Sequence, residues 1–252
     1  MSYKNYIIQI SDCHLFGDKN TKINGANAYA NLYSVLINIK NLNQKPDLIV
    51  VSGDLSQDCT FESYQHLANL LNKTEIKYHL LPGNHDDINI MNKVFEFNWV
   101  KENVDYSFEL NNWFFYVLDT SAYPEDSGTL SKNQLLKLEN TLSQNKVKPT
   151  VIFLHHHPVP INSPWMDKMI LKETKDFNNI ISQNLQVKAV LFGHIHQVFE
   201  KTINDTFYAS APSTSYQVLP NTEMFTIEKL IPGYRLIELN DNKFSSKVVW
   251  VE

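Results

Sequence analysis

The sequence lacks several features that would assign it to a special class of protein. No apolar run approaches the roughly 20 residues that a membrane-spanning helix needs. Only two cysteines occur, Cys13 and Cys59, so a disulfide framework is excluded, and free thiols are typical of a reducing compartment. The start, "MSYKNYIIQISDCHL", has no basic region followed by an apolar segment and a cleavage site. We therefore expect a soluble, cytoplasmic protein that makes no use of a membrane.

Basic residues are sparse and scattered along the chain. The 252 residues include 22 Lys and Arg against 27 Asp and Glu, which gives a formal net charge of −5. Proteins that bind nucleic acid do so largely through clustered Lys and Arg on phosphates, so a polymeric nucleic acid is not an expected partner. The composition is that of an ordinary globular protein, 43% hydrophobic and 19% charged. We expect a single domain over 1–252.

Hydrophobic periodicity predicts alternating strands and helices. Thr60 is expected to cap one helix, and Ser131 with Gln134 has the spacing of a capping box at the start of another. The portion from about 207 is richer in strands and is expected to be antiparallel. Strands are predicted at 5–10, 47–51, 76–81, 113–120, 150–154 and 187–192, and helices over 27–43, after Thr60 and after Ser131. The fold class is therefore α/β.

Glycine is scarce, with 7 residues, yet Gly83 and Pro82 stand directly before an amide, an imidazole and two carboxylates in "LPGNHDDINI". A Pro-Gly pair is a turn signal, so these side chains should lie on a loop at the end of a strand. The same arrangement recurs in "SDCHL", "SGDL", "HHHPVP" and "GHIHQ", each just beyond a predicted strand. In open α/β sheets ligands bind at that edge, so the five loops should converge on one site.

These loops carry a set of potential metal ligands. Carboxylate, amide and imidazole groups together suit borderline divalent ions such as Mn, Fe, Co or Zn better than calcium. Asp12 and His14 alternate by two, so both can face one ion if the segment is extended, with Cys13 on the opposite side. His194 and His196 repeat this spacing. The candidates are Asp12, His14, Asp54, Asn84, His155, His194 and His196.

Seven protein ligands are too many for one tetrahedral ion but suit two ions that share a bridging carboxylate. Such a pair polarises a phosphoryl group and generates a bridging hydroxide that attacks in line with the departing oxygen. The pattern thus predicts phosphoester hydrolysis. Any one motif alone has a structural explanation, since Asp-x-His is common in solvated loops and Gly-His-x-His can be a hydrogen-bonded turn. The ordered set of five favours the metal site.

The blocks "DCH", "GDL", "GNHD", "HHHP" and "GHIH" resemble those of the calcineurin-like metallophosphoesterase superfamily, in the same order and over most of the chain. "GDLSQD", "SPWMD", "APSTS" and "IPGYR" resemble, further, the bacterial class III cyclic nucleotide phosphodiesterases. The resemblance implies two mixed β-sheets packed as a sandwich flanked by helices. It also implies that one metal is held by Asp12, His14 and His196, the other by Asn84, His155 and His194, with Asp54 bridging.

The resemblance assigns His85 to the phosphate rather than to a metal, where it stabilises charge or protonates the departing 3′ oxygen, with Asp86 as its orienting partner. A packing role is the alternative. In "HHHP", His155 directly follows the strand and is the expected ligand, whereas His156 and His157 could face the substrate or pack beneath the loop. Trp165 and Asp167, with Ser210–Ser215, border the nucleotide by resemblance, although packing and a solvated turn explain them equally.

The expected function is hydrolysis of 3′,5′-cyclic AMP to 5′-AMP, with His85 and Asn84 contacting a small cyclic nucleotide, in a monomer or homodimer. Within the same chemistry, the alternatives are a broader phosphodiesterase, such as a glycerophosphodiesterase, or a nucleotide-sugar lipid hydrolase. A lipid substrate would call for an exposed apolar lid, which the sequence does not indicate. A non-catalytic scaffold should have lost ligands, and none of the seven is missing.

Overall fold

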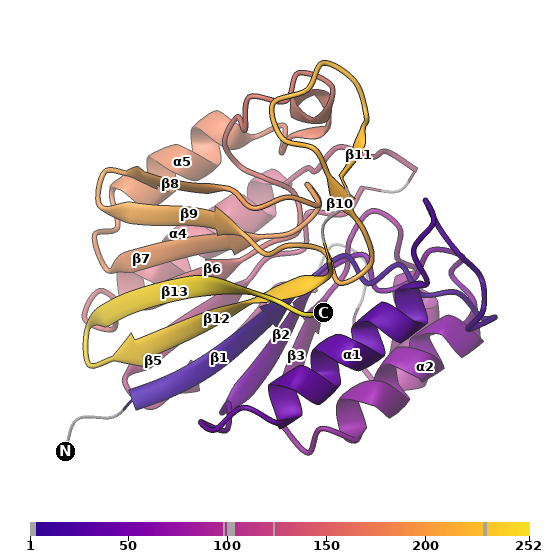
Figure 1. Ribbon diagram of the computed structural model, residues 1–252. Coiled ribbons are helices and arrows are strands. Elements are labelled where there is room, and N and C mark those ends of the chain that lie inside the picture. The colour runs from indigo at the N-terminus through magenta and orange to yellow at the C-terminus, as the bar shows by residue number, and fades with distance from the viewer. Residues whose placement is uncertain (1–3, 98, 100–103, 123, 229–230) are drawn as a thin grey trace.

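Two mixed β-sheets pack face to face, with helices on both outer surfaces (Figure 1). The computed structural model describes residues 4–97, 99, 104–122, 124–228 and 231–252. The first sheet has the strand order β13-β12-β1-β2-β3 and the second the order β4-β5-β6-β7-β9-β8. This is the α/β sandwich that the sequence predicted. Among the described residues, no helix has the length and apolar character needed to cross a bilayer.

The first sheet joins both ends of the chain. Strands β1, β2 and β3 are parallel, and β12 pairs antiparallel with β1 and with β13. Part of the antiparallel tail expected from the sequence thus forms the edge of this sheet, whereas residues 207–210, also expected to be antiparallel, pair parallel with residues 189–192 of the second sheet. Its strands are β1 (Lys4–Ile10), β2 (Leu48–Ser52), β3 (Tyr78–Leu81), β12 (Gly233–Asn240) and β13 (Lys243–Trp250).

The second sheet is parallel through its centre, from β5 to β6, β7 and β9, and antiparallel at both edges. Its strands are β4 (Tyr106–Leu110), β5 (Trp113–Val117), β6 (Thr150–Phe153), β7 (Val187–Phe192), β8 (Glu200–Ile203) and β9 (Thr206–Ser210). A separate two-stranded pair, β10 (Gln217–Val218) and β11 (Ile227–Glu228), lies outside both sheets. In Figure 1 it projects beyond the ends of the central strands.

Alternation along the strands builds three layers of core. In β2, Ile49 and Val51 pack under the helices, while Leu48 and Val50 face the other sheet. Successive side chains of a strand point to opposite faces, so a strand buried on both sides reads as a continuous apolar run. The core between the sheets also contains Ile7, Leu81, Trp113, Phe115, Phe153 and Leu191.

The helices begin at residues that satisfy their first N–H groups. Thr60 accepts from Ser63 N, and Ser131 and Gln134 form the predicted capping box. Asp87 caps the next helix by accepting from Asn89 N. Figure 1 shows α1 and α2 over the first sheet and α4 and α5 over the second. The helices are α1 (Ala28–Lys40), α2 (Phe61–Asn72), α3 (Ile88–Phe95), α4 (Lys132–Gln144) and α5 (Thr174–Ser182), with a 3₁₀ turn at Met166–Met169.

Replacing Asp119 by asparagine should stabilise the fold at neutral pH. Asp119 follows β5 and is 5% exposed, and its Oδ1 accepts from Ser121 N at 2.8 Å. Burial raises the pKa of this carboxyl to about 6. Since the folded protein holds the proton more tightly than the unfolded chain, stability falls as pH rises from about 4 to 6 and stays lower above it. Asparagine keeps the Oδ1 acceptor and removes this ionisation.

We expect Asp119→Asn to gain about 1–3 kcal/mol at pH 7.5 and to weaken the pH dependence between about 4 and 6. Urea unfolding at several pH values in the presence of a chelator measures both effects. Asp126→Asn removes an exposed carboxyl from the same region and serves as the control. Parallel stability curves for wild type and Asp119→Asn would show that the buried carboxyl carries no such cost.

Candidate metal centre

Residues at the carboxyl ends of five strands meet at one edge of the sandwich. Two buried groups of side chains could each hold a metal ion, with the ligand atoms of each group within 4.8 Å of one another. The first group contains Asp12, His14, Asp54 and His196, and the second contains His155, His156 and His194. Asn84 joins them, because its Oδ1 lies 3.2 Å from His155 Nε2. All seven predicted ligands are therefore brought together.

Strained backbone presents most of these side chains. The φ angle is positive at Asp12, His14, Asp54, His194 and His196, between 45° and 70°. Non-glycine residues rarely adopt this left-handed region, and such strain, about 1–3 kcal/mol each, tends to collect at functional sites. The segment around Asp12 is thus not extended as predicted. Both side chains nonetheless face the site, while Cys13 between them is fully buried in the core under α1 and α2.

The first group has two imidazoles whose unprotonated nitrogens face each other, an arrangement that a cation would stabilise. His14 Nδ1 lies 2.7 Å from Gln57 Oε1, and His196 Nδ1 lies 2.9 Å from the Tyr216 carbonyl. Each Nδ1 faces an acceptor and so carries its hydrogen, which leaves a lone pair on each Nε2. The two Nε2 atoms are 2.8 Å apart. Burial lowers the pKa of His14 to about 3 and of His196 to about 4, so a proton shared between the two Nε2 atoms would be held weakly. A divalent ion can instead accept both lone pairs.

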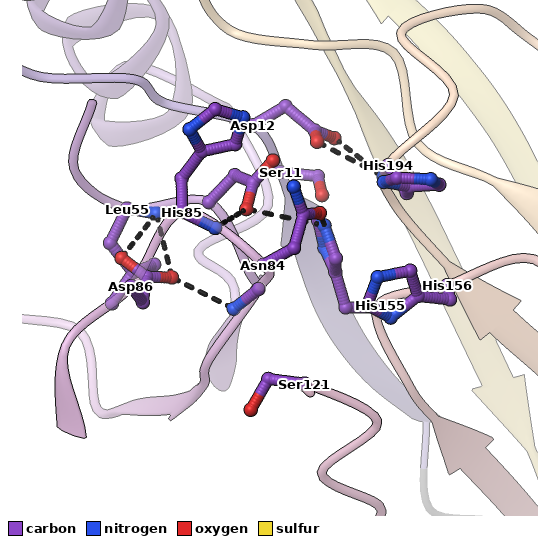
Figure 2. Close-up of polar contacts among 12 residues, drawn as sticks. Ser11, Asp12, Leu55, Asn84, His85, Asp86, Ser121, His155, His156 and His194 are labelled. Carbon is purple, nitrogen blue, oxygen red and sulfur yellow. Dashed lines mark hydrogen bonds and ion pairs between the residues drawn. The ribbon is translucent and has the colours of Figure 1, made fainter. Parts of the chain in front are cut away.

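The second group is equally rich in acceptors. His155 Nδ1 faces the Ser52 carbonyl at 2.8 Å, so Nε2 offers its lone pair to the site beside Asn84 Oδ1 (Figure 2). His156 directs Nδ1 to Thr120 Oγ1 at 2.8 Å. The Nε2 atoms of His156 and His194 are buried and have no hydrogen-bond partner among the described residues. Buried polar atoms are normally satisfied, and a metal ion would satisfy these.

Asp54 lies between the two groups. Its Oδ2 is 3.6 Å from His14 Nε2, and its Oδ1 is 3.3 Å from His155 Nε2. One carboxylate thus directs one oxygen to each group. Burial alone would lower the pKa of His155, but the charges of Asp54 and Asp12 outweigh it and raise the pKa to about 9. The site therefore attracts positive charge, as a dinuclear metal site requires.

Glycine is used where the chain must approach the ligands closely. A Cβ on Gly83 would lie 2.1 Å from Asp54 Oδ1, and one on Gly53 would lie 2.2 Å from His155 Nδ1. Gly53 also has a φ of 91°, which side chains rarely tolerate. The Pro82–Gly83 turn thus serves a second purpose besides ending β3. It allows the loops that carry Asn84 and Asp54 to lie against each other.

His85 lies beside the metal centre but contacts a different partner from the one predicted. Its ring meets that of His14 edge to face, with centroids 5.1 Å apart, and its Nδ1 lies 3.3 Å from Gln57 Nε2. Asp86 instead accepts from the backbone of Leu55 and Gly83, at 3.1 and 2.8 Å, as Figure 2 shows for Leu55. A carboxylate gains more from several N–H donors than from one half-buried imidazole. Asp86 therefore ties two site loops together.

Gln57 is the residue that sequence reasoning missed. Its amide contacts His14 through Oε1 and His85 through Nε2. The "GDLSQD" block placed it near the site, but glutamine carries no chemical signature that separates an orienting residue from a solvated one. The choice depends on contacts 28 and 43 residues apart in sequence, which only the folded chain creates.

The structure also shows where the Ser210–Ser215 loop and His157 lie. The loop Ser210–Ser215 is buried rather than a solvated turn, and Ser213 Oγ donates to the Asp12 carbonyl at 2.8 Å. His157 packs beneath the site, with Nε2 3.4 Å from Asp167 Oδ1 and its ring stacked on that of His194. Both features support the ligand loops from behind.

Comparison with known proteins agrees with this geometry. The model of the calcineurin-like phosphoesterase family matches residues 6–198, a span that contains every candidate ligand. A 3′,5′-cyclic-nucleotide phosphodiesterase of Nostoc sp. is 35% identical over 243 residues, covering 96% of this chain and 91% of the relative. The 3′,5′-cyclic adenosine monophosphate phosphodiesterase CpdA of Haemophilus influenzae is 34% identical over 238 residues, covering 94% and 86%.

Solved structures share the architecture. A dimetal phosphatase from Danio rerio superposes with a TM-score of 0.71 at 12% sequence identity, over 98% of this chain and 99% of the phosphatase. At that identity the likeness concerns the fold alone. The family match and the near full-length relatives go further, and together they show that the chain belongs to the calcineurin-like phosphoesterase family.

Proposed function

We propose that this protein is a metal-dependent phosphodiesterase that hydrolyses 3′,5′-cyclic AMP to 5′-AMP. The observation that carries the proposal is the position of Asp54, whose two oxygens face two buried groups of ligand atoms. A shared carboxylate between two clusters is the arrangement that a two-metal phosphoester hydrolase needs. The substrate assignment draws on the names of the relatives, which act on cyclic nucleotides.

In this proposal each ion has its own ligands. Asp12, His14 and His196 would hold one ion, Asn84, His155 and His194 would hold the other, and Asp54 would supply an oxygen to each. Mn, Fe, Zn and Co all suit such a donor set. When bound, the two ions polarise the phosphoryl group and lower the pKa of a water that serves as nucleophile. His156 Nε2 is a further potential metal ligand beside His194, and the centroids of the two rings are 4.6 Å apart.

His85 supplies the proton for the leaving group. Gln57 Oε1 faces the Nδ1 hydrogen of His14, so its amide nitrogen is the atom that faces His85. That nitrogen donates to His85 Nδ1, so the ring hydrogen lies on Nε2. As water oxygen adds to phosphorus and the P–O3′ bond breaks, this hydrogen passes to the 3′ oxygen, and the proton that the attacking water releases returns to His85 Nε2. His85 N also donates to Asp54 Oδ1 at 3.0 Å, which fixes the loop.

The test is to identify the product. Protein loaded with Mn²⁺ or Fe²⁺ should convert cyclic AMP to 5′-AMP and no 3′-AMP, because the proton donor is proposed to face O3′. Chromatography of the product, with cyclic GMP and a glycerophosphodiester assayed in parallel, measures both the cleaved bond and the substrate range. Activity should vanish with a chelator and return with metal.

A protein that leaves cyclic AMP intact but cleaves the glycerophosphodiester would contradict the substrate and retain the reaction class. Full metal occupancy with no turnover of any diester would contradict both and favour a binding module. The matched control is Asp18→Asn, which changes an exposed carboxylate outside the site and should behave as wild type.

A further inference from the structure

The β10–β11 hairpin carries apolar side chains that the described part of the chain leaves exposed. Phe225 is 48% exposed and Met224 is 75% exposed, both on the connection between the two short strands. Exposed apolar clusters next to a functional site commonly mark a surface that binds a ligand or another protein. The hairpin lies beyond residues 6–198, the span that the family model matches.

The base of the hairpin is fixed directly to the metal centre. Val218 N donates to the His196 carbonyl at 2.8 Å, and His196 Nδ1 donates to the Tyr216 carbonyl at 2.9 Å. The Tyr216 ring lies 4.3 Å from the His196 ring and 5.8 Å from the His14 ring, measured between centroids. The hairpin therefore starts in contact with two candidate ligands of one ion.

A row of aromatic rings leads outward from this contact. The Phe225 ring is 6.5 Å from that of Tyr216 and 5.4 Å from that of Trp165, at interplanar angles of 80° and 90°. Asn221 N donates to Ser163 Oγ at 3.0 Å, which fastens the hairpin to the segment that bears Trp165. The rings thus form a supported wall, and Phe225 at its outer end is exposed.

The charge of the hairpin decides which part of a ligand lies against it. Residues 216–228, "YQVLPNTEMFTIE", contain Glu223 and Glu228 and no Lys or Arg. This segment repels phosphate, which the metal centre attracts, and suits a neutral flat group instead. A cyclic nucleotide has both parts, an anionic phosphate and a neutral base, at the two ends of one small molecule.

We propose that Tyr216, Phe225 and Trp165 form an aromatic wall that stacks the nucleobase while the phosphate lies at the metal centre. This inference rests on the proposed function and adds to it a specificity-determining surface. Because every base has a π-face, stacking selects for the presence of a base and not for its hydrogen-bonding edge. The wall should therefore favour nucleotides over base-free diesters and treat adenine and guanine alike.

The test is Phe225→Ala assayed with cyclic AMP, cyclic GMP and the abasic 1-O-methylribose 3′,5′-cyclic phosphate. We expect KM for both nucleotides to rise about tenfold, equal to about 1.4 kcal/mol, with a much smaller change in kcat. The KM for the abasic analogue should change little, and Phe225→Trp should restore the KM for both nucleotides. Calorimetric binding of 5′-AMP gives a second readout, in which the affinity should weaken by a similar factor. Met224→Ala removes a neighbouring exposed side chain without a ring and should match wild type.

The proposed stacking would be overturned if active wild type and Phe225→Ala have equal KM values for the nucleotides. It would also be overturned if KM for the abasic analogue rises as much as KM for the nucleotides. A shift in oligomeric state with unchanged KM would also overturn it and identify the hairpin as a contact between copies. Wild type that hydrolyses neither cyclic nucleotide would instead contradict the proposed function, which keeps the two failures separate.

Discussion

Asp54→Asn should lose both metal ions and nearly all hydrolysis. The substitution keeps Oδ1, which accepts from His85 N, but removes the charge shared by the two ligand groups. Outer-shell partners of a metal typically contribute about 10–100-fold to its affinity, and a bridging ligand should exceed that for both ions. We expect metal content after desalting to fall well below that of wild type, and kcat/KM to fall by more than about 10³-fold.

Elemental analysis and hydrolysis rates measure the two effects on the same sample. Circular dichroism of Asp54→Asn should match wild type, since the asparagine is isosteric and buried in the same contacts. Two equivalents of metal in the variant would contradict the bridging position. Loss of one ion alone would show that Asp54 belongs to a single group.

His85→Ala should slow the chemistry while leaving the metals bound. His85 contacts the ring of His14 and the amide of Gln57 but is not among the candidate ligands. Positioned proton donors contribute about 10²–10⁴-fold to the rate. We expect kcat for cyclic AMP to fall within that range. The kcat for a p-nitrophenyl phosphodiester should fall much less, because p-nitrophenolate departs without protonation.

Metal analysis again provides the control, since His85→Ala should retain wild-type metal content. Equal losses for the two substrates would show that His85 stabilises charge on the phosphate rather than protonating the leaving oxygen. Gln57→Leu is the comparison variant. It removes the partner of both His14 and His85, so it should lower metal affinity by about 10–100-fold and reduce kcat by less than His85→Ala.

Local signals predicted most of the elements. The continuous apolar runs of β1, β2, β6 and β7 and the caps at Thr60 and Ser131 were readable because the residue types themselves favour those structures. The short helix α5 was not predicted. It fully buries only Phe177 and Ile181, with Ile180 partly buried beside them, and its other residues are polar, so packing against the second sheet stabilises it more than propensity does.

The orienting partner of His85 shows where sequence reasoning fails. Asp86 is adjacent in sequence and was the natural choice, but adjacent residues on a loop point in different directions. Gln57 comes from another loop, after a different strand, and reaches His85 only because β2 and β3 are neighbours in the sheet. The three consecutive histidines show the same limit, since their directions depend on packing against Asp54, Thr120 and Asp167.

The sequence by itself determined the fold class, the order of the polar loops and the identity of the candidate ligands, because strand periodicity and ligand chemistry are local properties. Only the tertiary structure decided which nitrogen of each histidine faces the site, which oxygen of Asp54 faces each group, and that Gln57 and the aromatic hairpin adjoin the centre. The physical reason is that these contacts join residues far apart in the chain. Their geometry depends on strand pairing, backbone strain and close packing, which no local pattern encodes.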